Sequence, residues 1–225
     1  MTNKPVTIFF DVNETLSDLT PVGDAFEAIG AGRGVSATWF NTVLRDGFAL
    51  TSTGSQARFL EIAQTNARDI LRGLPLTGSL ESSVDAVLDA FSTVQLHDDV
   101  APGIRALHAA GHRLFTLSNG PASTAERLLR EAGLSDLVDG TLSVEEHAPW
   151  KPARGAYEDA LTRTNAHAHG SAYLVAVHPW DIHGAAEAGL STVWVNRGDS
   201  LYPPHFRAPT ETVLSISELA ERLDG

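Results

Sequence analysis

Short, unbroken apolar runs are the first clear feature in the pattern of hydrophobic and polar positions along this chain. They are rich in residues that favour β-strands, and runs of this length are typical of parallel strands covered on both faces. The predicted strands are residues 6–10, 113–118, 172–177 and 191–195. We therefore expect a parallel sheet with helices on both of its faces.

The segments between the last three of these runs have the periodicity of helices. They are residues 122–133, 153–164 and 182–188. The first follows Pro121, and Gly133 and Gly189 end two of them, as is usual at helix limits. Strands alternating with helices predict a doubly wound α/β fold, with the turn-rich residues 196–210 as a loop before a last helix.

Residues 17–96 interrupt this pattern. They contain no convincing strand but several amphipathic segments, which are residues 20–30, 36–50, 56–74 and 79–92. We predict a catalytic core of residues 1–16 and 97–225 and an inserted α-helical domain of residues 17–96.

Composition narrows the class of protein. The chain has 225 residues, 43% of them hydrophobic, and a formal net charge of −12, which argues against a general nucleic-acid or anionic-membrane binder. The absence of cysteine excludes disulfides and thiolate metal sites. No run approaches the length of a membrane span or signal segment, so we expect a cytoplasmic protein.

Polar residues follow the predicted strands at their carboxyl ends, where open α/β sheets bind ligands. They are Asp11, Asn13 and Thr15, then Ser118, Asn119 and Gly120, then His178, Trp180 and Asp181, with Lys151 before a helix. Each has a simpler explanation: Asp11 as a turn former, Ser118 as a helix cap, Asp181 as a first-turn acid, Lys151 as a solvated surface residue. Their repetition at several strand ends favours a site.

The segments DVNET, LSNG, KP and WD, in this order, resemble the four motifs of the haloacid dehalogenase-like superfamily. LSNG, KPxxxxY, PWDIHGA and VWVNR resemble more narrowly its L-2-haloacid dehalogenase (type II) branch. The resemblance spans nearly the whole chain. It implies a Rossmann-like core, a helical cap inserted after the first strand, and a homodimer.

Two positions depart from the phosphatases of that superfamily. Asn13 stands where phosphatases use a second acid, and an amide cannot transfer a proton near neutral pH. Val177 stands where they have an aspartate that binds Mg²⁺, and its side chain offers no oxygen ligand. Chloride or bromide leaves carbon without being protonated, so we expect no metal and no cofactor.

The resemblance implies a role for each catalytic candidate. Asp11 displaces halide from C2 of a small 2-haloacid, preferably the L enantiomer, and water hydrolyses the resulting aspartyl ester to a 2-hydroxy acid. Lys151 keeps Asp11 ionised, Thr15 supports its loop, and Asp181 positions the water. His178 is either a base near neutral pH or a structural residue.

The remaining candidates concern substrate binding. Ser118 and the backbone N–H groups of Asn119 and Gly120 are expected to hold the substrate carboxylate. Tyr157 is expected to contact Asp181, Lys151 or the substrate. The further candidates for this pocket are Val12, Asn13, Phe40 and Trp180.

The cap supplies aromatic residues for an apolar wall or for its own packing, namely Trp39, Phe40, Phe48 and Phe59. Related dehalogenases carry a cap arginine that contacts the halide, and Phe40 stands where we expect it. Either Arg45 or Arg33 substitutes, or Asn41, Phe40 and Trp180 form a different halide site.

Two alternatives stay open at this point. One is a hydrolase of the same superfamily acting on a phosphate ester or another activated carbon, which Mg²⁺ dependence distinguishes. The other is a non-catalytic scaffold that binds a small carboxylate or a protein. Retention of Asp11, Lys151 and Asp181 disfavours the scaffold, although fold alone does not choose.

Overall fold

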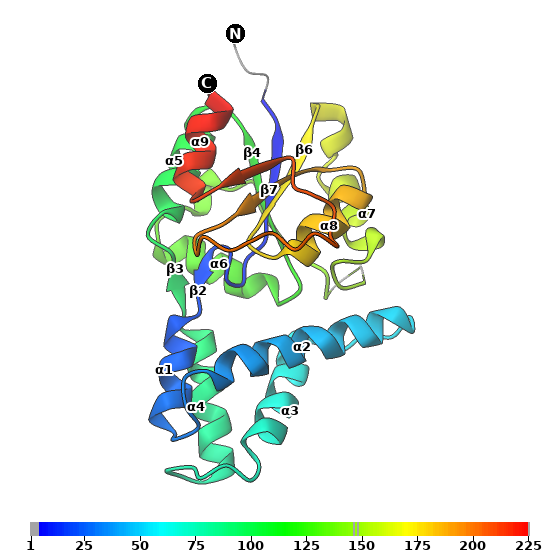
Figure 1. Ribbon diagram of the computed structural model, residues 1–225. Coiled ribbons are helices and arrows are strands. Elements are labelled where there is room, and N and C mark those ends of the chain that lie inside the picture. Colours follow the sequence, from blue (N-terminus) through cyan, green and yellow to red (C-terminus); the bar gives the residue numbers. More distant parts are fainter. Residues whose placement is uncertain (1–4, 146, 148, 225) are drawn as a thin grey trace. The chain divides into compact units, whose positions relative to one another are not determined.

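The computed structural model describes residues 5–145, 147 and 149–224 (Figure 1). The chain divides into two compact units. Asp18–Gln95 forms the cap unit, and the described residues on either side of it form the core unit. Each limit of the cap unit lies one residue inside the predicted limits of 17 and 96.

A six-stranded sheet organises the core unit, with strand order β5-β4-β1-β6-β7-β8 and parallel pairing throughout. Its strands are β1 (Thr7–Phe10), β4 (Arg113–Ser118), β5 (Gly140–Ser143), β6 (Ala172–Ala176), β7 (Ser191–Val195) and β8 (Glu211–Val213). The predicted α/β class and its four strands are confirmed. The prediction missed β5 and β8, which are short, partly exposed edge strands without an unbroken apolar run.

The central strand β1 determines where polar residues gather. All four of its residues are buried, and Phe10 at its end lies opposite Thr116 of β4 and Val175 of β6. Because the three strands are parallel and in this register, the segments that follow them leave the sheet at the same edge. The chain order reverses on the two sides of β1, as at the ligand-binding edge of doubly wound folds.

Helices cover both faces of the sheet (Figure 1). They are α5 (Val100–Ala109), α6 (Ala122–Glu131), α7 (Arg154–Arg163), α8 (Pro179–Glu187) and α9 (Ile216–Asp224), with short 3₁₀ turns at Ser135–Leu137 and Ala166–His169. Ile8 and Phe10 pack into an apolar cluster with α5 and α9, while the Phe9 ring lies 5.7 Å from that of Phe115. Helix α8 begins at Pro179, three residues before the predicted start.

The cap unit is α-helical, as the sequence predicts. It contains α1 (Thr20–Ala28), α2 (Val35–Ser52), α3 (Phe59–Leu71) and α4 (Leu80–Ser92). The helices enclose an aromatic cluster in which the Trp39 ring lies 5.7 Å from Phe91 and 5.9 Å from Phe26, and the Trp39 Nε1–H donates to the Ala63 carbonyl at 2.9 Å.

Two strands that the sequence did not predict, β2 (Ser17–Asp18) and β3 (Gln95–Leu96), pair where the chain passes between the units. None of the described helices is both long enough and apolar enough to cross a membrane.

Candidate active site

Asp11 is held by hydrogen bonds on both sides of its carboxylate. It follows the last residue of β1, and its backbone N–H donates to the Val175 carbonyl at 3.0 Å. Oδ1 accepts from Lys151 Nζ at 2.8 Å, and Oδ2 accepts from Thr15 Oγ1 at 2.7 Å. The residue is 4% exposed. A buried carboxylate with two donors is fixed in orientation as well as in charge.

A tight loop returns Thr15 to Asp11. The backbone N–H groups of Leu16 and Ser17 both donate to the Val12 carbonyl at 2.9 Å. Thr15 Oγ1 also accepts from the backbone N–H of Val177 at 3.1 Å, which joins this loop to the end of β6. The predicted supporting role of Thr15 rests on these two contacts.

Lys151 lies between two acids. Its Nζ donates to Asp11 at 2.8 Å and to Asp181 Oδ2 at 2.6 Å, and the residue is fully buried. Its backbone is clamped by Asn119, whose Nδ2 donates to the Lys151 carbonyl at 3.0 Å while its Oδ1 accepts the Lys151 N–H at 2.8 Å. The alternative of a solvated surface lysine is therefore wrong. The Asn119 side chain positions Lys151.

Asp181 lies in the first turn of α8 and is fully buried. Its Oδ2 accepts from Lys151, and its Oδ1 accepts from the Tyr157 hydroxyl at 2.6 Å. Of the partners expected for Tyr157, Asp181 is the one it contacts. Gly184, one turn further along α8, makes room for this contact: a Cβ there would lie 2.7 Å from the Tyr157 hydroxyl oxygen.

The two acids differ in electrostatics. Burial by itself raises the pKa of Asp11, but Lys151, His178 and the Thr15 hydrogen bond together offset this and hold that pKa below its ordinary 3.8. Burial raises the pKa of Asp181 despite Lys151. Burial favours the neutral amine of Lys151, yet the two carboxylates raise its pKa above 10.5. Burial and Asp181 raise the pKa of Tyr157 well above 10.0, so it stays a donor.

The residues after β4 form a second part of the site. The Gly120 N–H donates to Ser118 Oγ at 2.9 Å, and the Gly120 carbonyl accepts from Ser143 Oγ at 2.8 Å. The Gly120 N–H, expected to bind a substrate carboxylate, is thus engaged by Ser118 in this structure. The Ser118 hydroxyl accepts that bond, which orients its own proton for donation.

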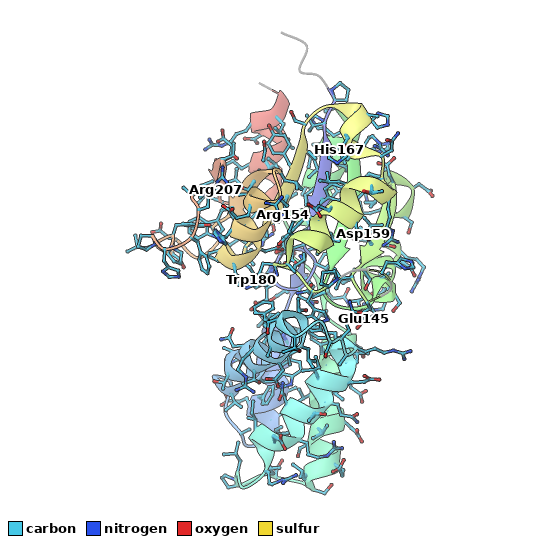
Figure 2. All side chains as sticks on the ribbon, turned by 90° about the vertical axis from the view of Figure 1, so that its right-hand side faces the viewer. Glu145, Arg154, Asp159, His167, Trp180 and Arg207 are labelled. Atoms are coloured by element: carbon cyan, nitrogen blue, oxygen red, sulfur yellow. The ribbon has the colours of Figure 1, made fainter. Side chains whose placement is uncertain are left out.

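His178 and Trp180 follow β6. Their rings stack with centroids 5.0 Å apart, and Lys151 Nζ lies 6.0 Å from the centroid of the Trp180 ring. Figure 2 labels Trp180, which lies in the first turn of α8. His178 Nε2 lies 3.2 Å from the Asn13 carbonyl and 3.7 Å from Asp11 Oδ2. These distances place the imidazole against the loop that carries the carboxylate.

Phe40 belongs to the cap unit and packs within it. Its ring centroid lies 6.4 Å from that of Trp39 and 6.2 Å from that of Phe59. Both arginines considered as halide ligands pair with cap carboxylates: Arg45 with Asp46 at 2.8 Å, and Arg33 with Asp24. The substrate and halide roles of these residues stay predictions.

Glu14 is a site residue that the sequence reasoning missed. It adopts φ 62°, a left-handed conformation that is uncommon for a residue other than glycine. Its Oε2 lies 3.6 Å from His178 Nε2. The signal available in the sequence was a charged residue directly after Asn13 in the DVNET segment. The strained backbone of Glu14, a feature that concentrates at functional sites, is visible only in the structure.

The residues do not provide the Mg²⁺ site of the phosphatases in the superfamily. Val177 stands at the position of one metal ligand, and its side chain packs against the apolar cluster of the sheet. A hard cation requires oxygen donors there. We therefore derive no chemical step through a metal ion.

Comparisons with known proteins identify the family of the chain. The family model of the haloacid dehalogenase-like hydrolases matches residues 6–189. The (S)-2-haloacid dehalogenase of Pseudomonas sp. (strain YL) is 30% identical over 218 residues, covering 95% of this chain and 92% of that relative. Haloacetate dehalogenase H-2 of Moraxella sp. (strain B) is 28% identical over 212 residues, covering 93% and 94%.

A solved structure extends the likeness to the fold. The L-2-haloacid dehalogenase from Xanthobacter autotrophicus, with chloropropionic acid covalently bound, matches with a TM-score of 0.85 at 22% identity, covering 98% of this chain and 99% of that one. At this identity the likeness shows the fold alone. From the family model and the sequence relatives, the chain belongs to the haloacid dehalogenase-like hydrolase family, in the branch that contains the (S)-2-haloacid dehalogenases.

Proposed function

We propose that this protein hydrolyses small 2-haloacids to 2-hydroxy acids, with preference for the L enantiomer and without a metal ion. The observation that carries the proposal is the Asp11 carboxylate, buried and held by Lys151 and Thr15 at the carboxyl end of β1. The sequence relatives named (S)-2-haloacid dehalogenase and haloacetate dehalogenase support the choice of substrate class.

The first step is displacement at carbon. One Asp11 oxygen forms a bond to C2 as the carbon–halogen bond breaks, and the halide leaves with the bonding electrons. The pKa of Asp11, lowered by Lys151, keeps this carboxylate ionised at neutral pH. Its two hydrogen bonds restrict the carboxylate to one orientation, which reduces the entropic cost of reaching in-line geometry. The expected product is an ester with inverted configuration at C2.

The second step is hydrolysis of this ester. Water attacks the Asp11 carbonyl carbon, and the 2-hydroxy acid leaves as the carboxylate is restored. Lys151 stays bound to Asp181 while Asp11 is esterified, so the buried cation retains a partner. We assign the Ser118 hydroxyl, at the carboxyl end of β4, as the side-chain donor to the substrate carboxylate.

Asn13 makes this function more probable than phosphate transfer on chemical grounds. A phosphate ester needs an acid to protonate its leaving group, and an amide cannot serve. The backbone carbonyl oxygen of Asn13, which is distinct from its side-chain amide, lies 3.2 Å from His178 Nε2. Val177 removes an expected oxygen ligand for Mg²⁺. If this protein acted as a phosphatase, it would lack both the proton donor and this metal ligand.

The test is halide release. The purified protein is incubated with each enantiomer of 2-chloropropionate, with and without EDTA, and chloride is measured. We expect release from the L enantiomer that persists in EDTA and is lost in Asp11→Asn, while the exposed Asp136→Asn control retains it. Absence of chloride, together with Mg²⁺-dependent cleavage of a phosphate ester, would refute the proposal.

The resemblance also implies a cytoplasmic homodimer. Size-exclusion chromatography with light scattering measures the oligomeric state, and a monomer at all working concentrations would contradict that expectation.

A further inference from the structure

His178 presents a proton donor to the site. Three oxygens surround its Nε2: the Asn13 carbonyl at 3.2 Å, Glu14 Oε2 at 3.6 Å and Asp11 Oδ2 at 3.7 Å. A nitrogen lone pair directed at three oxygens would be repelled by all of them, so we assign a proton to Nε2 from these contacts. This nitrogen is therefore not available to take a proton from water.

Asp181 is equally unsuited to act as a base. Its two oxygens accept from Lys151 Nζ and from the Tyr157 hydroxyl at 2.6 Å each, and it is fully buried. Both oxygens are engaged and the side chain is shielded from solvent, so neither oxygen is open to an attacking water molecule. Its contacts hold Lys151 in place.

Glu14 has the properties that these two residues lack. Its carboxylate is 44% exposed and therefore within reach of solvent, and it faces the same His178 nitrogen as Asp11 does. Burial raises the pKa of Glu14 above its ordinary 4.5, and the nearby Asp11 charge adds to this, while His178 and His97 act in the opposite direction.

We propose that Glu14 is the general base of ester hydrolysis and that His178 orients it toward Asp11. This inference rests on the proposed function. As water attacks the carbonyl carbon of the Asp11 ester, its proton passes to Glu14 Oε2. The tetrahedral intermediate then expels the alkoxide of the 2-hydroxy acid, which takes the proton from Glu14. Glu14 is restored as a carboxylate, the second proton of the water leaves the Asp11 carboxyl group for solvent, and no other reactant is consumed.

The order of charges supports this assignment. Before the first step the Asp11 carboxylate raises the pKa of Glu14. Esterification removes that negative charge, so Glu14 ionises more readily when the ester awaits hydrolysis. Ionisation of the base is thus favoured in the intermediate that needs it.

The test separates the two half-reactions with L-2-chloropropionate. Rapid-quench measurement gives the chloride burst, and intact-protein mass spectrometry gives the amount of Asp11 ester. In Glu14→Gln we expect a burst of about one chloride per site, followed by ester that decays about 100-fold more slowly or worse. Glu158→Gln, an exposed carboxylate on α7, is the matched control and should behave like the unmodified protein.

Glu14→Gly tests the backbone separately. Glycine adopts φ 62° without strain, so this variant keeps the loop and removes only the carboxylate. We expect it to trap the ester as Glu14→Gln does. Normal ester decay in either variant, or loss of the chloride burst in both, would overturn the proposal.

The pH profile provides a third readout. The groups that face Glu14 are Asp11, His178 and His97. Because His178 lowers the pKa of Glu14, His178→Gln should move the acid limb of ester decay to higher pH. An unmoved limb contradicts the Glu14–His178 pairing. If the unmodified protein releases no chloride, the proposed function fails and this inference fails with it; if it does and Glu14→Gln turns over normally, only the inference fails.

Discussion

Replacing Lys151 with methionine tests the electrostatic argument for the site. Methionine is close to lysine in length and volume, so the substitution removes a charge and leaves little cavity. The lost groups are the Nζ donors to Asp11 at 2.8 Å and to Asp181 at 2.6 Å. The variant then buries two facing carboxylates that share no cation. Most of its cost should therefore be electrostatic.

The expected loss is about 3–5 kcal/mol of unfolding free energy at pH 7, the usual cost of removing one partner from a buried ion pair. Its pH dependence follows from the pKa directions. Asp11, lowered below 3.8, contributes stability that is present above its unfolded pKa and lost as pH falls through its folded pKa. Lys151, raised above 10.5, contributes stability that is present below its unfolded pKa and lost only as pH rises through its folded pKa. The deficit should be largest between about pH 6 and 9. It should be smaller at about pH 4, because without Lys151 burial raises the pKa of Asp11 in the variant and that carboxyl can become neutral.

The assay is urea unfolding followed by far-ultraviolet circular dichroism at pH 4, 7 and 9. Arg130→Met, an exposed cation on α6, is the control and should change stability by less than about 0.5 kcal/mol. A Lys151→Met deficit that is the same at pH 4 and pH 7 would show that packing, and not charge, causes it. A deficit below about 1 kcal/mol at pH 7 would refute the reasoning.

Three further predictions concern two residues near Lys151 and the need for a metal ion. Gly184→Ala places a Cβ 2.6 Å from Pro152 and 2.7 Å from the Tyr157 hydroxyl oxygen. Thermal unfolding should therefore show that the free energy of unfolding falls by about 1–3 kcal/mol, and the rate of chloride release should fall as well. Unchanged stability together with unchanged chloride release would contradict this geometry. Asn119→Ala leaves the Lys151 backbone N–H and carbonyl without their side-chain partner and should cost about 2 kcal/mol or more by urea unfolding, whereas an unchanged midpoint would show that water replaces the amide. Dialysis against EDTA should leave chloride release unchanged, and activity that returns only with Mg²⁺ would show that a metal takes part.

Much of the core could be predicted from the sequence because buried parallel strands require unbroken apolar runs. The runs at 6–10, 113–118, 172–177 and 191–195 each contain an observed strand. Where a strand was short and at a sheet edge, as with β5 and β8, half-exposure removed that signal. The amphipathic pattern of residues 17–96 indicated helices correctly, since each of them buries one face against its neighbours.

Some residues of the candidate site could be predicted from the sequence. Strand ends gave Asp11, Ser118 and Asp181, because parallel strands bring their carboxyl ends to one edge. The partner of Tyr157 could not be decided from the sequence, since Asp181, Lys151 and the substrate were all possible partners and the sequence carries no distances. The backbone N–H of Asn119 was expected to bind the substrate carboxylate. The contact of the Asn119 side chain with the Lys151 backbone was not predicted, because it depends on a loop conformation that no local pattern encodes.

The sequence by itself determined the α/β class, the helical insertion and the polar residues at the strand ends, because periodicity and burial act on neighbouring residues. Only the tertiary structure placed Lys151 between Asp11 and Asp181, residues 140 and 30 positions away along the chain. The physical reason is that the stability of a buried charge depends on the partner within hydrogen-bonding distance, and folding brings that partner from distant parts of the chain. The same holds for Glu14, whose contact with His178 spans the loop after β1 and the start of α8.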